Sequence, residues 1–174
     1  MELIILLTIQ CSIILFVYSI YKCAEYSIPN KSIIISIDGN IGSGKSTLVK
    51  ILKTKLGSNV SIIEEPVQLW QSIQNQSNEN ILDLFYKDSV RWSYTFQNLA
   101  FITRSLVLNN AKLGKNKIIL VERSTETDKH VFAKCLYDTD KMSKMEYELY
   151  NVWYDKFKHK IDGYIYLQTS PNKC

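Results

Sequence analysis

Gly39-Asn40-Ile41-Gly42-Ser43-Gly44-Lys45-Ser46 fits the pattern G-x-x-x-x-G-K-[ST] of a phosphate-binding loop. The residues on either side of the loop strengthen the match. Ile33 to Ile37 is mostly apolar and predicts a buried strand, and Lys45 to Leu56 carries apolar residues at helical spacing. A strand, a glycine loop and a helix in this order direct backbone N–H groups and a helix N-terminus at an anion.

Lys45 and Ser46 give this loop the chemistry of a site for ATP. We expect Lys45 to reach the β- and γ-phosphates and the Ser46 hydroxyl to hold Mg²⁺. The dinucleotide fingerprint G-x-G-x-x-G fits less well, because Thr47 stands where its third glycine belongs. The predicted phosphate-binding residues are Gly39, Asn40, Ile41, Gly42, Ser43, Gly44, Lys45, Ser46 and Thr47.

The length and composition predict one domain with a leader. The chain has 174 residues, of which 46% are hydrophobic, and a net charge of +4. We expect a hydrophobic leader at 1–22, a linker at 23–31 and the domain at 32–174. The sequence has no basic stripe of the kind that a nucleic-acid-binding protein carries, so we expect no nucleic-acid partner. The four cysteines lack paired spacing, which argues against a zinc site or a disulfide framework and fits a reducing compartment.

The leader predicts a membrane anchor. Residues 3–21 carry no charge and are long enough to cross the hydrocarbon core of a bilayer. Lys22 and Lys31 follow this segment, so the domain would face the cytoplasm. A cleaved signal peptide fits less well, because a basic first region and an A-x-A cleavage site are missing. The alternative is an apolar run added by an upstream start codon, which would leave a cytoplasmic protein.

Alternating strand and helix patterns predict an α/β fold. A parallel sheet flanked by helices follows from this order, and ligands bind such sheets beyond the carboxyl ends of the strands. Three predicted strands end in reactive residues: the loop from Gly39, Glu64-Glu65 and Glu122-Arg123. The predicted strands lie near 32–37, 60–63, 118–121 and 164–167, and the main helices at 45–56, 93–112, 127–137 and 144–158.

Four motifs together resemble deoxynucleoside kinases, in the branch of deoxycytidine and deoxyguanosine kinases. They are Ile37 to Thr47, Glu65-Pro66-Val67 with Trp70, Trp92 to Gln97, and Glu122-Arg123-Ser124. The resemblance runs from about Ser32 to Cys174. It implies a P-loop kinase-type fold and an enzyme of nucleotide salvage. Such an enzyme transfers the γ-phosphoryl group of ATP to the 5′-hydroxyl of a deoxynucleoside.

The resemblance also implies catalytic roles. Glu65 would be the general base on the 5′-hydroxyl, and Arg123 would neutralise charge on the transferred phosphoryl group. Glu122 would help Ser46 to hold Mg²⁺. Glu122 is also a second candidate for the base, and the sequence leaves the choice between it and Glu65 open.

Further residues are assigned to the deoxynucleoside by the same resemblance. Gln97 would read the edge of the base, and Arg104 paired with Asp128 would favour deoxycytidine or purine deoxynucleosides. Phe96 and Phe132 would enclose the base, although both fit ordinary core positions equally well. The sugar would be bound by Trp70, along its wall, and by Tyr86, at the 3′-hydroxyl.

Departures from the family shape two further expectations. The family continues beyond residues 167–174 into an arginine-rich lid and a final strand, so we expect an incomplete domain with weak or no activity unless the missing part acts in trans. A non-catalytic nucleotide-binding remnant is the alternative. A nucleoside monophosphate kinase fits less well, because it leaves Tyr94 to Gln97 unexplained. The family also suggests a homodimer through the helix 93–112.

Overall fold

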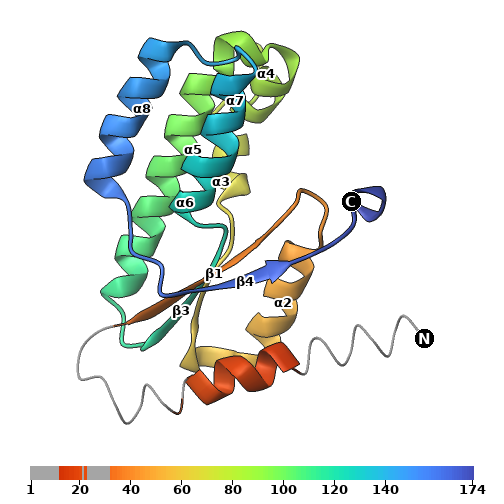
Figure 1. Cartoon of the computed structure of the whole chain (residues 1–174), viewed down its shortest axis with the longest axis vertical. Coiled ribbons are helices and arrows are strands. Elements are labelled where there is room, and N and C mark those ends of the chain that lie inside the picture. Colours follow the sequence, from red (N-terminus) through yellow and green to blue (C-terminus); the bar gives the residue numbers. More distant parts are fainter. Residues whose placement is uncertain (1–11, 21, 23–31) are drawn as a thin grey trace. The chain divides into compact units, whose positions relative to one another are not determined.

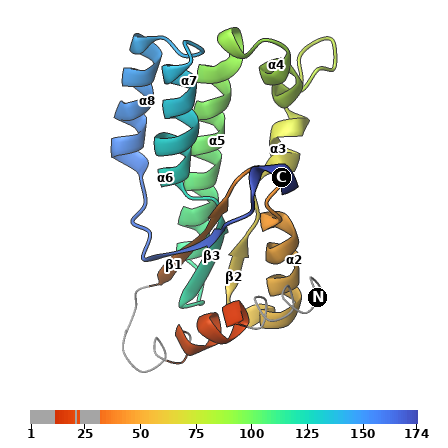
Figure 2. The same ribbon diagram turned by 45° about the vertical axis from the view of Figure 1, so that its right-hand side comes forward.

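The computed structural model describes residues 12–20, 22 and 32–174. These residues form two compact units. The first unit contains the described residues up to Glu64, together with Ala111–Glu122 and Ile161–Cys174. The second unit contains Glu65–Asn110 and Arg123–Lys160. Figures 1 and 2 show the helices and strands of both.

The first unit is built on a parallel sheet. Its strands are β1 (Ile33–Gly39), β2 (Ser61–Ile63), β3 (Ile118–Glu122) and β4 (Gly163–Leu167), in the order β2-β3-β1-β4. β1 and β3 are rich in isoleucine and almost entirely buried, as expected for central strands of a parallel sheet. The predicted α/β fold with a parallel sheet and flanking helices is therefore confirmed.

Helix α2 (Lys45–Leu56) supplies the apolar layer against this sheet. Its Val49 and Leu52 are buried in one core cluster with Ile35, Ile37 and Leu120 of the strands. The helix ends at Gly57, whose φ of 58° fits a glycine C-cap, and a short 3-10 turn, η1 (Gly57–Asn59), follows. A second such turn, η3 (Pro171–Lys173), follows β4. The core thus anchors the carboxyl end of β1 and the start of α2, where the phosphate loop lies.

A helical segment at residues 12–20 also packs on this core. Val17 is fully buried within the same cluster, while Leu15, Phe16 and Tyr18 are exposed. The structure describes only residues 12–20 of the predicted membrane anchor at 3–21, and the other residues of that segment lie outside the described part of the chain. Among the described helices, none combines the length and the apolar character that crossing a bilayer requires. The anchor stays a prediction.

The second unit is helical. Its longest helix is α5 (Ser89–Lys112), which begins at Ser89 rather than at the predicted Ser93 and reaches the first unit only with its last two residues. The predicted helix 127–137 is divided into α6 (Thr125–Thr127), a π-helical stretch η2 (Asp128–Ala133) and α7 (Lys134–Asp138). The other helices are α3 (Val67–Ser72), which the sequence did not predict, α4 (Ile81–Lys87) and α8 (Lys144–Phe157).

Two apolar clusters hold the helices of the second unit together. Phe101 of α5 packs with Tyr150 and Tyr154 of α8 and with Ala133 of η2. On the other side of the unit, α3, α4 and α5 meet through Trp70, Ile81, Phe96 and Ala100. Figures 1 and 2 show α7 and α8 running alongside α5. The buried side of α5 therefore faces both clusters, and two of the polar residues predicted for substrate binding, Gln97 and Arg104, are buried on that same helix.

Candidate functional site

The phosphate loop joins β1 to α2 in the first unit. Gly44 has a φ of 90° and is the N-cap of α2, so this position requires the left-handed backbone that glycine adopts readily. At Gly39 an added Cβ would lie 2.7 Å from the Ser43 Oγ and 2.8 Å from the carbonyl oxygen of Leu167. The loop conformation therefore depends on glycine at both positions.

The Lys45 side chain lies along this loop. Its ammonium group donates to the carbonyl oxygen of Gly39 at 2.9 Å and to that of Asn40, and the Ser43 hydroxyl is 3.4 Å away. Lys45 is buried. These contacts hold a positive charge at the loop that the sequence predicts to bind phosphates.

Ser46 and Glu122 are direct neighbours in the first unit. The Ser46 hydroxyl, in the first turn of α2, donates to Oε1 of Glu122 at the end of β3 over 2.6 Å. A hydroxyl and a carboxylate suit Mg²⁺, which usually takes few protein ligands and completes its shell with phosphate oxygens and water. No larger group of His, Cys, Asp or Glu side chains that could hold a metal occurs within residues 12–20, 22 and 32–174. The two predicted ligands fit this ion.

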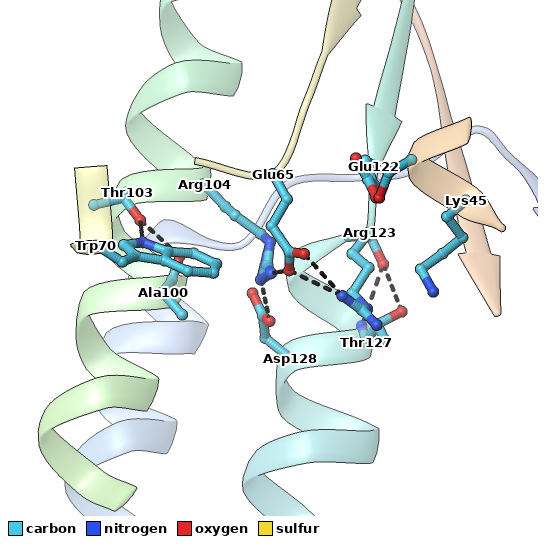
Figure 3. A network of polar contacts seen from close by, with 12 residues as sticks. Lys45, Glu65, Trp70, Ala100, Thr103, Arg104, Glu122, Arg123, Thr127 and Asp128 are labelled. Atoms are coloured by element: carbon cyan, nitrogen blue, oxygen red, sulfur yellow. Dashed lines mark hydrogen bonds and ion pairs between the residues drawn. The ribbon is translucent and has the colours of Figure 1, made fainter. Parts of the chain in front are cut away.

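Glu65 stands between two arginines in the second unit (Figure 3). Arg123 Nη1 lies 3.0 Å from each carboxylate oxygen of Glu65, and Arg104 Nη2 donates to Oε1. Glu65 precedes Pro66, the N-cap of α3, while Arg104 comes from α5 and Arg123 follows β3. The motif Glu65-Pro66-Val67 is thus held by side chains distant in sequence.

The two arginines set the protonation state of Glu65. Burial alone would raise the pKa of this carboxyl group, but the charges and hydrogen bonds of Arg104 and Arg123 outweigh it and hold the pKa below its ordinary value. The folded protein therefore keeps Glu65 ionised even as the pH falls below neutrality. An ionised carboxylate can orient a hydroxyl group and accept its proton late in a transfer reaction.

Asp128 binds the other terminal nitrogen of Arg104 (Figure 3). Its Oδ1 accepts from Nη1 of Arg104, and only 1% of the residue is exposed. Burial raises the pKa of Asp128 to about 6; Arg104 opposes this shift and the nearby Glu65 adds to it. Arg104 therefore bridges two carboxylates, whereas the sequence predicted only its pairing with Asp128.

Arg123 occupies a strained backbone conformation. Its φ of 63° lies in the left-handed region, which is unusual for a residue with a side chain, and such conformations cluster at functional sites. The guanidinium group lies over the Phe132 ring, 5.0 Å from its centre, and the next residue, Ser124, caps α6. The strain directs the arginine toward Glu65 at the point where β3 gives way to a helix.

Aromatic side chains line the neighbourhood of Arg104. The guanidinium group lies 5.2 Å from the centre of the Trp70 ring, and Trp70 meets Phe96 edge-on with ring centres 5.3 Å apart. Trp70 Nε1 donates to the Thr103 hydroxyl over 3.0 Å, and Phe85 packs on Phe96 with ring centres 5.0 Å apart. Sequence reasoning assigned no role to Phe85 or Thr103. Their sequence positions offered a signal for both residues. Thr103 directly precedes the predicted substrate-binding residue Arg104, and Phe85 directly precedes Tyr86.

Several buried polar atoms in this unit have no hydrogen-bond partner among the described residues. They include Oε1 of Gln97, Nε of Arg104 and Oδ2 of Asp128. Buried polar groups in native proteins are nearly always paired, so such atoms call for a partner.

The described contacts do not include two that the sequence predicted for the substrate, those of Tyr86 with the sugar and of Phe96 and Phe132 with the base. Tyr86 is 75% exposed on α4, with its ring against Phe85. Phe96 packs with Trp70 and Phe85, whereas the described contact of Phe132 is with Arg123. The enclosure of a base between Phe96 and Phe132 and the sugar contact of Tyr86 stay predictions.

Comparison with known proteins assigns the family. The model of the family described as deoxynucleoside kinase matches residues 35–174, so the chain belongs to the deoxynucleoside kinases. This assignment confirms the resemblance drawn from the four motifs.

Individual relatives agree with this assignment. The chain is 43% identical over 145 residues to a probable deoxycytidine kinase of fowlpox virus and 35% identical over 163 residues to the deoxycytidine kinase of Bos taurus. It is 34% identical over 161 residues to the mitochondrial deoxyguanosine kinase of Xenopus laevis. Each match covers 80% of this chain but only 57%, 62% and 60% of the respective relative.

Replacing Arg104 by Met tests the charge cluster. The substitution leaves Glu65 with Arg123 alone and Asp128 without its ion pair, so the free energy of unfolding at pH 8 should fall by about 3–5 kcal/mol. The loss should shrink toward pH 5, because protonation removes the uncompensated charge of Asp128. Urea unfolding at both pH values measures this. Arg91→Met is the control: Arg91 is exposed and lies over the Trp92 ring. Equal losses in the two variants would contradict the cluster's role.

Proposed function

We propose that this protein transfers the γ-phosphoryl group of ATP to the 5′-hydroxyl of a deoxynucleoside, with deoxycytidine or a purine deoxynucleoside favoured. One observation carries the proposal: the half-buried Glu65 carboxylate is held between two arginines, which lower its pKa. A carboxylate fixed in this way can orient a substrate hydroxyl group. Family membership and the phosphate loop from Gly39 to Ser46 support the same reaction.

The contacts of the two acidic candidates favour Glu65 as the base. Glu122 accepts a hydrogen bond from the hydroxyl of Ser46, the residue that follows Lys45 in the phosphate loop. The position of Glu122 beside this hydroxyl suits a ligand of Mg²⁺. Glu65 instead contacts two arginines, and Arg123 is a suitable donor to a transferred phosphoryl group. We therefore assign the base to Glu65 and the metal to Ser46 and Glu122. Bound Mg²⁺ would neutralise charge on the phosphates.

Each side chain of the site then has its own role in the proposed reaction. Lys45 and the backbone N–H groups of the loop bind the phosphates of ATP. Glu65 orients the 5′-hydroxyl and collects its proton, while Arg123 stabilises charge on the phosphoryl group in the transition state. Arg104 and Gln97 bind the polar edge of the base through their unpaired buried atoms, and Asp128 holds Arg104 in place.

Glu65→Gln should remove the base without changing the size of the side chain. We expect kcat for phosphorylation of deoxycytidine to fall by about 10²–10⁴-fold, with a small change in KM. Labelled phosphate transfer from ATP measures it. Glu64→Gln is the matched control: Glu64 is exposed and pairs with Lys53 on the surface. If both variants retain wild-type kcat, Glu65 is not the base. A wild-type protein that binds ATP but phosphorylates no deoxynucleoside would support the non-catalytic alternative.

Nucleoside binding should depend on pH through Asp128. The pKa of this group in the folded protein is about 6, above its ordinary value, so the charged form that pairs with Arg104 is lost as the pH falls through 6. We expect KM for the deoxynucleoside to rise below pH 6, while KM for ATP changes little. The pKa of Asp128 is higher in the folded protein than in the unfolded chain, so between about pH 4 and 6 the folded state binds more protons. The contribution of Asp128 to the free energy of unfolding therefore decreases as the pH rises through this range. A KM that stays constant from pH 8 to 5 would contradict the role of Asp128.

We also propose that α5 contributes to a homodimer. Ile102 and Leu106 of α5 are exposed, and α8, which adjoins α5 through the hydrogen bond from Ser105 Oγ to the carbonyl oxygen of Phe157, exposes Leu149, Val152 and Trp153. Such an apolar surface commonly marks an interface. Leu106→Glu should convert a dimer into a monomer in sedimentation experiments, whereas Leu113→Glu, at a position 86% exposed, should not. A monomeric wild-type protein would refute the dimer.

A further inference from the structure

Tyr150 carries a buried hydroxyl group for which packing gives no reason. It lies on α8, is fully buried, and meets Phe101 of α5 edge-on with ring centres 5.7 Å apart. In the part of the chain that the structure describes, its hydroxyl has no hydrogen-bond partner. Phenylalanine would fill the same space without burying an O–H group, which is unfavourable unless the group is bonded. The hydroxyl therefore points to a partner that is not a protein side chain.

The surroundings of Tyr150 connect it to the Arg104–Asp128 pair. Tyr150 shares a cluster with Ala133, the last residue of the π-helix that begins at Asp128. Its ring rests on Phe101, which lies between Gln97 and Arg104 on the buried side of α5. Burial and, after it, the charge of Asp128 raise the pKa of the Tyr150 hydroxyl, so the phenol stays protonated and able to donate.

Asp128 carries a buried acceptor that also lacks a hydrogen-bond partner among the described residues. Its Oδ1 accepts from Arg104, while its Oδ2 is buried and without a partner within the described residues. The Tyr150 hydroxyl is thus a donor and Oδ2 of Asp128 an acceptor, both without a partner among the described residues and close enough for the charge of Asp128 to act on the phenol. Buried waters in proteins typically join polar groups of this kind, and a water can accept from a phenol while it donates to a carboxylate.

We propose that a buried water molecule joins the Tyr150 hydroxyl to Oδ2 of Asp128, and that Tyr150 is thereby a positioning residue for recognition of the base. The water fixes the rotation of the carboxylate about its side chain. Asp128 in turn fixes the guanidinium group of Arg104. Arg104 also contacts Glu65, but the two contacts of Arg123 hold that carboxylate without the water or Tyr150, so the phosphoryl transfer should change less than the binding of the base. The kinetic role rests on the proposed function, whereas the bridge does not.

A crystal structure of the wild-type protein tests the bridge directly. We expect an ordered water within hydrogen-bonding distance of both the Tyr150 hydroxyl and Oδ2 of Asp128, and we expect it to be lost in Tyr150→Phe. A wild-type structure without this water, or with the hydroxyl bonded elsewhere, would overturn the proposal. This result is decisive whether or not the protein is a kinase.

Kinetics of Tyr150→Phe test the positioning role. KM for deoxycytidine should rise about tenfold, as expected for loss of a hydrogen bond to a charged group, with kcat and KM for ATP nearly unchanged. Tyr147→Phe is the matched control, because it removes a hydroxyl from the same helix where the ring stacks on Tyr137. Equal KM values in the two variants would overturn the positioning role. A wild-type protein inactive on every deoxynucleoside would refute the proposed function instead, and the crystal structure would then decide the bridge.

Discussion

The ion pairs of Arg104 are the interaction on which the second unit's site depends. One buried guanidinium group bridges Glu65 and Asp128, and Arg123 supplies the second positive charge. The four groups together are neutral, so ionised side chains can remain buried. The two carboxylates have opposite pKa shifts: the two arginines lower the pKa of Glu65, whereas burial, with the charge of Glu65, outweighs the arginines and raises the pKa of Asp128. A single arrangement therefore keeps Glu65 ionised and contains a second carboxylate, Asp128, with a pKa of about 6.

Backbone geometry brings these side chains together. Each comes from the end of an element or from one side of α5: Glu65 before α3, Arg123 after β3, and Asp128 at the start of a π-helix. The unusual φ of Arg123 and the π-helical turn both fall in this short stretch, where a strand gives way to helices. Strain concentrated beside buried charges is typical of sites whose geometry serves a reaction rather than stability.

The sequence predicted what local patterns determine. The phosphate loop, the flanking strand and helix, and the parallel sheet follow from glycine spacing and apolar periodicity within short windows. The contact of Arg104 with Glu65, the packing of Phe85 on Phe96 and the buried Tyr150 hydroxyl join residues far apart in the chain, so no local pattern reveals them. The π-helix was missed because its residues carry ordinary helical periodicity. Hydropathy assigned Val17 to a membrane segment, whereas the described structure buries it in the core of the first unit.

A structure of the protein with deoxycytidine and ADP tests the central claim most directly. The account predicts that the 5′-oxygen of the nucleoside lies within hydrogen-bonding distance of the Glu65 carboxylate, with Arg104 and Asp128 at the polar edge of the base and the ADP phosphates on the loop from Gly39 to Ser46. A nucleoside bound with its 5′-oxygen at Glu122, or away from both arginines, would contradict it.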